Sequence, residues 1–75
     1  EGRIVRLTSM IDGGDKRPEL YIERGKSYFQ RNEWGNAIND FNRAKAIDPE
    51  NNEAQQLLDM AYEILSFRYK DIYNP

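Results

Sequence analysis

The stretch that decides the fold reads Tyr21-x-x-Arg24-Gly25-x-x-Tyr28, then Ala37-x-x-x-Phe41, then Ala44 and Pro49. In a helix of 3.6 residues per turn, Tyr21, Gly25 and Tyr28 share one face. A second helical face follows, and it combines large and small apolar residues: Trp34, Ala37, Ile38, Phe41, Ala44 and Ile47. The spacing therefore predicts two amphipathic helices that pack against each other.

The small residues in this pattern predict where the two helices come closest. We expect Gly25 to lie opposite Ala37, because two small residues let helix backbones approach closely. Tyr28, Trp34 and Phe41 would then fill the space around this contact. A glycine inside a helix costs ~1 kcal/mol relative to alanine, so its presence at position 25 indicates a packing role.

Turn signals set the ends of the two helices. Pro18 is suited to the first turn of the first helix, and Asp48-Pro49 ends the second. Residues 30–33 predict a tight connection between them, with Asn32 in a left-handed conformation.

Helical periodicity continues on both sides of this pair. Upstream, apolar residues recur at helical spacing before the turn signal Gly13-Gly14, and they are Ile4, Leu7, Met10 and Ile11. Downstream, Asn51 or Asn52 can cap a long helix. Its predicted core face consists of Ala54, Leu57, Leu58, Ala61, Tyr62 and Leu65. The sequence therefore predicts an all-α fold of about four helices.

The central pattern resembles one tetratricopeptide repeat (TPR), a helical hairpin of ~34 residues with the pattern W-x-x-L-G-x-x-Y, A-x-x-x-F and P. The resemblance implies a TPR-like, right-handed α-α superhelix. Residues 1–17 would form an N-terminal helix and turn, 18–51 a complete repeat, and 52–75 a capping helix and tail. Gln55 and Asp59 would occupy positions that normally contact a further helix, which is typical of a cap.

The chain departs from the family pattern at Arg24, where the family usually has leucine. We interpret Arg24 as a side chain whose stem packs on the helix while its charged head stays in water. Tyr21 in place of tryptophan is a mild change, because both are large amphipathic aromatic residues.

Composition and charge limit the classes of function. A net charge of −2 and a pI near 5.0 do not fit a nucleic-acid-binding surface, which needs a basic patch. We recognise no signal peptide and no segment that could span a bilayer, so we expect a soluble, cytoplasmic chain that binds no membrane. The first residue is Glu1 rather than methionine, which leaves a processed chain or a fragment open.

Catalysis has little support in the sequence. The chain contains no histidine and no cysteine, so its serines have no histidine base and a thiolate metal site cannot form. Asp48, Glu50 and Glu53 lack the glycine-centred spacing of a calcium loop. We therefore predict a protein that is not an enzyme and that holds no metal and no cofactor.

A second apolar stripe on the last predicted helix is not explained by the core. Met60, Ile64 and Phe67 lie roughly 120° from the centre of the core face. In the register that the TPR resemblance implies, this stripe lines the concave groove beside residues of the preceding helix. The candidate partner-binding residues are therefore Ile22, Lys26, Phe29, Met60, Ile64 and Phe67.

Three interpretations of this stripe are open. The TPR resemblance implies a protein-interaction module whose groove holds a peptide or helix of a partner, with Lys26 recognising an acidic neighbour. Alternatively, the stripe mediates a homodimer or stacks the chain on further repeats. In the third interpretation the stripe is core, covered by the N-terminal helix or by Tyr69, Ile72 and Tyr73 of the tail.

Overall fold

The computed structural model describes residues 2–68 of the 75-residue chain. This part contains four helices and no strand: α1 (Gly2–Asp12), α2 (Pro18–Gln30), α3 (Trp34–Ile47) and α4 (Asn52–Arg68). The predicted all-α fold of four helices is thereby confirmed. The predicted role of Tyr69, Ile72 and Tyr73 falls outside the described residues.

Local signals end the helices where the sequence predicts. Pro18 is the first residue of α2, where its missing N–H needs no partner. Asn32 has a φ of 61°, which is the left-handed conformation predicted for the connection between α2 and α3. The Asn51 side chain caps α4, because its Oδ1 accepts a hydrogen bond from the backbone N–H of Ala54 at 3.0 Å.

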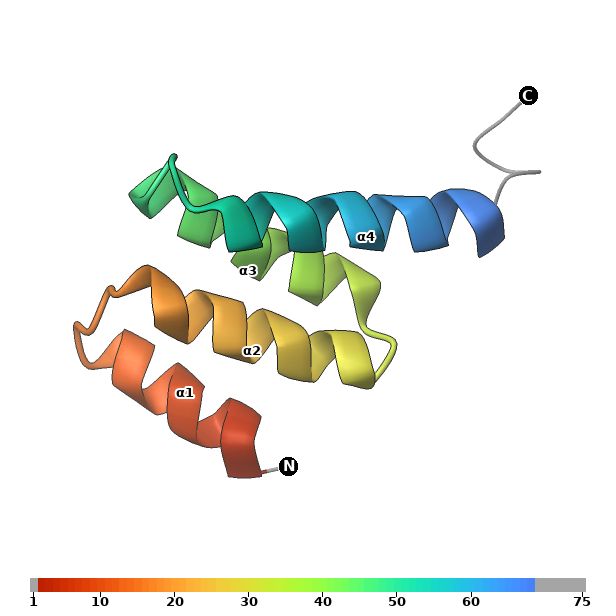
Figure 1. Ribbon diagram of the computed structural model, residues 1–75. Coiled ribbons are helices and arrows are strands. Elements are labelled where there is room, and N and C mark those ends of the chain that lie inside the picture. The colour runs from red at the N-terminus through yellow and green to blue at the C-terminus, as the bar shows by residue number, and fades with distance from the viewer. Residues whose placement is uncertain (1, 69–75) are drawn as a thin grey trace.

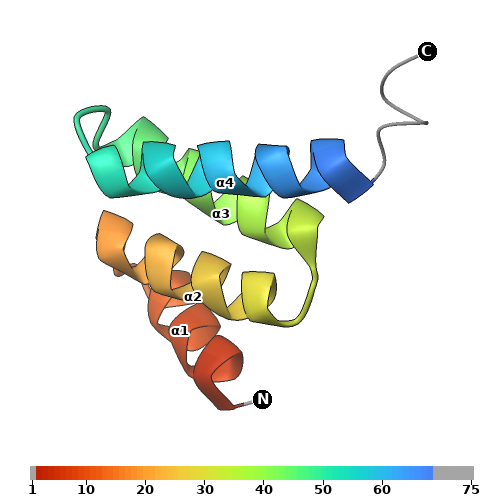
Figure 2. The ribbon, with the colours of Figure 1, turned by 45° about the vertical axis from the view of Figure 1, so that its right-hand side comes forward.

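The helices form a layered stack around a central hairpin. α2 and α3 run antiparallel, α1 packs against α2, and α4 packs against α3 on the opposite side (Figure 1). The rotated view keeps the same order of helices from α1 to α4 (Figure 2). One helix therefore flanks the hairpin on each side.

Apolar residues from all four helices are buried in two clusters. The cluster that joins all four consists of Leu7, Ile11, Leu20, Tyr21, Ile22, Ala44 and Ala54. The cluster between α3 and α4 consists of Ala37, Phe41 and Leu58. Leu57 packs against both clusters and links them. Burial of one large apolar side chain stabilises the folded state by ~1.5–3 kcal/mol. A small domain has little core, so its stability depends on these side chains.

Gly25 marks the closest contact between α2 and α3. A Cβ atom at this position would lie 2.5 Å from Cε1 and 2.8 Å from Cδ1 of Phe41, and 3.2 Å from Cβ of Asp40. Phe41 is itself completely buried and has no room to withdraw. The predicted packing role of Gly25 is confirmed, but its closest neighbours are Phe41 and Asp40 rather than Ala37.

Arg24 lies inside the stack, so the prediction that its head stays in water is wrong. Its Nε donates to Oδ2 of Asp40 and its Nη2 to Oδ1, both at 2.8 Å, and its Nη1 donates to Oγ1 of Thr8 at 3.1 Å. The guanidinium also lies 5.8 Å from the ring centroid of Tyr21 and 5.9 Å from that of Tyr28. The hydrogen bond to Asp40 raises the pKa of Arg24. One side chain thus connects α1, α2 and α3.

Candidate functional site

The C-terminal end of α4 extends beyond the rest of the stack. α4 has 17 residues and α3 has 14, and three extra residues add about 4.5 Å, almost one turn. In Figures 1 and 2 the last turn of α4 runs past the start of α3. The side chains of this turn therefore have no helix directly opposite them.

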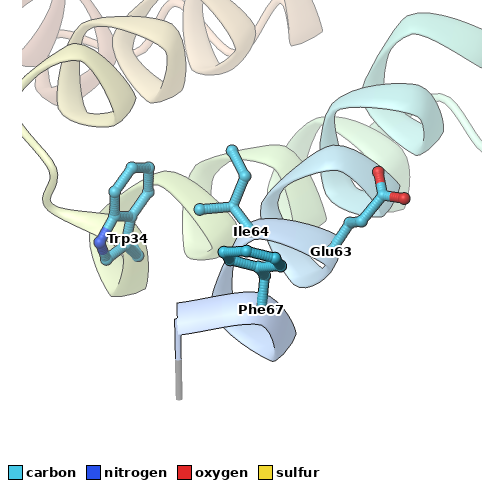
Figure 3. Close-up of a pocket in the computed structure, with 4 residues that line it drawn as sticks. All are labelled: Trp34, Glu63, Ile64 and Phe67. Carbon is cyan, nitrogen blue, oxygen red and sulfur yellow. The ribbon is translucent and has the colours of Figure 1, made fainter. Parts of the chain in front are cut away.

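A hollow of about 640 Å³ forms beside this turn, lined by Trp34, Glu63, Ile64 and Phe67. Figure 3 shows Trp34 on one side, with Ile64 and Phe67 across from it. Glu63 lies at the far edge, and its carboxylate points away from Trp34. The volume falls within the ~300–1,000 Å³ typical of ligand pockets, which is ample for the side chains of a bound peptide.

The Trp34 side of the hollow is fixed by packing. The rings of Trp34 and Phe29 meet edge to face, with centroids 4.8 Å apart and planes at 83°. Phe29 in turn packs against the buried cluster of Ala37, Phe41 and Leu58. Trp34 is therefore connected to the buried core through Phe29.

The opposite side is strongly exposed. Phe67 is 84% exposed and Met60, on the same stripe of α4, is 41% exposed, whereas Ile64 between them is partly buried. The interpretation in which the N-terminal helix covers this stripe is wrong, because α1 packs against α2 on the other side of the hairpin. The interpretation in which the tail covers it concerns residues outside the described part.

The six predicted site residues do not form one open groove. Ile64 and Phe67 line the hollow, Met60 lies one turn before Ile64 on α4, and the ring of Phe29 packs edge to face against Trp34. Ile22 is only 4% exposed within the core cluster, so its predicted contact with a partner is wrong.

Lys26, the remaining member of the predicted set, already has a partner within the chain. Its Nζ lies 2.7 Å from Oε2 of Glu53, and this ion pair joins α2 to α4. The described surface between these helices is thus occupied by an ion pair near the start of α4. The hollow lies elsewhere, between the start of α3 and the end of α4.

Trp34 and Glu63 line the hollow but are not among the predicted site residues. Trp34 had been assigned to the core face of its helix, but as the first residue of α3 it lies at the edge of the stack. Glu63 belongs to neither of the two apolar stripes predicted for its helix. Both residues line the hollow because of where the end of α4 lies relative to the start of α3, which the spacing within one helix does not give.

Another face of α4 carries residues 55, 59 and 62, and it is mainly polar. Nζ of Lys45 donates a hydrogen bond to Oε1 of Gln55, and Nε2 of Gln55 donates to Oδ1 of Asp59 at 2.8 Å. Tyr62 is 52% exposed, so its predicted place on the core face is wrong. Polar groups on this face therefore bond to each other and to Lys45 of α3.

Residues 2–68 contain no group of three or more carboxylate, histidine or cysteine side chains arranged to hold a metal ion. Over the same range no helix combines the length and the apolar character that crossing a membrane requires.

The family comparison bears on the central hairpin. The model of the tetratricopeptide repeat family matches residues 18–51, which are α2, α3 and the turns beside them. This match agrees with the resemblance to a tetratricopeptide repeat that the spacing of these residues indicates. Such repeats mediate protein–protein interactions and are not catalytic. No curated protein and no solved structure gave a significant match to the chain.

Proposed function

We propose that this chain is a non-catalytic protein-interaction module that holds a peptide or helix of a partner in the hollow at the end of α4. An apolar side chain of the partner would enter between Trp34 and the pair Ile64 and Phe67. Met60 would contact the next part of the partner along α4.

The observation that carries this proposal is the exposure of Phe67 beside a hollow with apolar walls. A phenylalanine with 84% of its surface in water contributes little to folding, and beside a hollow with apolar walls it forms part of a larger apolar surface. Burial of such a side chain against a partner contributes ~1.5–3 kcal/mol. That free energy corresponds to about a 10- to 100-fold gain in affinity.

The exposed aromatic residues of α4 give a matched test. Random 12-residue peptides are selected for binding to the chain, and the affinities of the selected peptides are measured by calorimetry. We expect Phe67→Glu to weaken them about 10- to 100-fold, because it removes an apolar wall of the hollow. Tyr62→Glu should leave them unchanged, since Tyr62 is also exposed but does not line the hollow.

Two results would contradict this proposal. Equal affinity of the peptides for wild type and Phe67→Glu would place the binding surface elsewhere. The competing proposal is a homodimer through the same stripe. It predicts that the molar mass measured by sedimentation equilibrium rises with concentration for wild type and stays at the monomer value for Phe67→Glu. Such a result would assign the hollow to a second copy of the chain.

A further inference from the structure

We propose that the partner segment carries a lysine or arginine next to its apolar anchor, and that this basic residue pairs with Glu63. The inference rests on the proposed function and adds the chemistry of the partner. It also reverses the expectation from sequence, in which Lys26 would select an acidic neighbour.

The first observation is that Lys26 and Arg31 are paired within the described part of the chain, whereas Glu63 is not. Lys26 is held by Glu53 at 2.7 Å, and Arg31 is held by Glu33 at 2.8 Å. Within residues 2–68, Glu63 takes part in no ion pair or hydrogen bond. A charge on the partner would therefore meet Glu63 without first breaking an internal pair.

The second observation is the place of Glu63 relative to the apolar walls. Glu63 lies one turn before Phe67 on α4, and its carboxylate lies at the edge of the hollow in Figure 3. An anchor side chain between Trp34 and Phe67 would bring the neighbouring residues of the partner across this edge. A cation there would be attracted by the carboxylate. A carboxylate there would be repelled.

The size of the effect follows from the exposure of Glu63. An ion pair at a solvated edge changes affinity by up to about fivefold, so the anchor supplies most of the affinity and Glu63 supplies selectivity. An acidic residue of the partner at this place would be repelled by Glu63. The affinities for peptides with a basic and with an acidic residue there should therefore differ by about 10-fold. Salt should reduce this difference, because the pair is exposed.

The test compares three versions of the chain in the selection of 12-residue peptides: wild type, Glu63→Lys and Glu50→Lys. Glu50 lies in the turn before α4, roughly 20 Å from Glu63 along the helix, so its reversal changes net charge equally but not the hollow. We expect wild type and Glu50→Lys to enrich lysine and arginine within four residues of an apolar anchor. Glu63→Lys should enrich aspartate and glutamate there.

The outcomes separate this inference from the proposed function. Peptides that depend on Phe67 but show the same charges with all three versions would overturn the role of Glu63 and leave the hollow as the binding site. A selection that yields no peptide dependent on Phe67 would overturn both. As a second measurement, raising the salt concentration should weaken a selected basic peptide several-fold with wild type, and clearly less with Glu63→Gln.

Discussion

Charged and apolar side chains are placed in opposite ways in the interior of the hairpin and at the end of α4. Inside the hairpin, the charged Arg24 is enclosed and makes hydrogen bonds to Asp40 and Thr8. No buried side-chain nitrogen or oxygen within residues 2–68 lacks a partner. At the end of α4, the apolar Phe67 is exposed and the charged Glu63 has no partner in the described part of the chain.

This difference shows which residues serve the fold. A chain of this length is stable by roughly 4–11 kcal/mol, so a single unpaired buried charge could remove a large share of that stability. The contacts inside the hairpin are accordingly complete. The exposed side chains at the end of α4 contribute little to these contacts, and the proposed function places a partner on them.

The largest effect is expected from Arg24→Leu, although leucine is the usual residue of the family at this position. The substitution leaves Asp40 buried without its cation, since the Asp40 side chain is only 3% exposed. Loss of one member of a buried pair costs about 3–5 kcal/mol. Chemical denaturation of the variant should show a loss of this size, or an unfolded chain.

The double variant Arg24→Leu with Asp40→Ala is the control for this experiment. It removes both charges, and replacement of a buried pair by apolar residues is often close to neutral. The double variant should therefore be more stable than Arg24→Leu alone. If Arg24→Leu alone is as stable as wild type, the ion pair does not hold the hairpin together as described.

A smaller loss, of about 1–3 kcal/mol, is expected from Gly25→Ala. The new Cβ would overlap the ring of Phe41, which has no space to move, and this outweighs the ~1 kcal/mol by which alanine favours a helix. Gly35→Ala is the matched control in α3, because a Cβ there meets nothing within 4 Å. Thermal unfolding should show opposite signs for the two variants, and the same sign would contradict the close contact at Gly25.

Most of the fold could be predicted because its signals are local. Pro18, Asn32 and Asn51 each fix a helix end through their own backbone or a neighbour within three residues. The partner of Arg24 could not be predicted in this way, because Asp40 lies on the next helix. From the sequence alone, Asp40 cannot be told apart from a solvent-exposed aspartate. Its pairing with Arg24 follows only from how α2 and α3 pack against each other.

The candidate site was predictable only in part for the same reason. The apolar stripe of α4 is a property of one helix, and so Ile64 and Phe67 could be read from their spacing. Whether Ile22 is open and whether Lys26 is paired depends on how close α2 lies to α4, which spacing does not give. The contribution of Trp34 depends on the relative lengths of α3 and α4.

A minor effect is expected where the surface between α2 and α4 is already occupied. Lys26→Ala removes the ion pair with Glu53, whose partners are 44% and 53% exposed. Exposed pairs of this kind contribute ~0.2–1 kcal/mol, and salt screens them. The difference in stability from wild type should therefore be small at low salt and smaller at high salt. A loss above 2 kcal/mol would mean that this pair belongs to the interior.

The smallest effect on stability is expected from Phe67→Glu, within about 0.5 kcal/mol of wild type, because the side chain is 84% exposed. Urea unfolding followed by circular dichroism measures this difference. A loss above 1 kcal/mol would mean that another part of the chain covers Phe67, and the end of α4 would then belong to the core. Unchanged stability together with lost peptide binding is the combination expected of a surface that is open in the folded chain and filled by a partner.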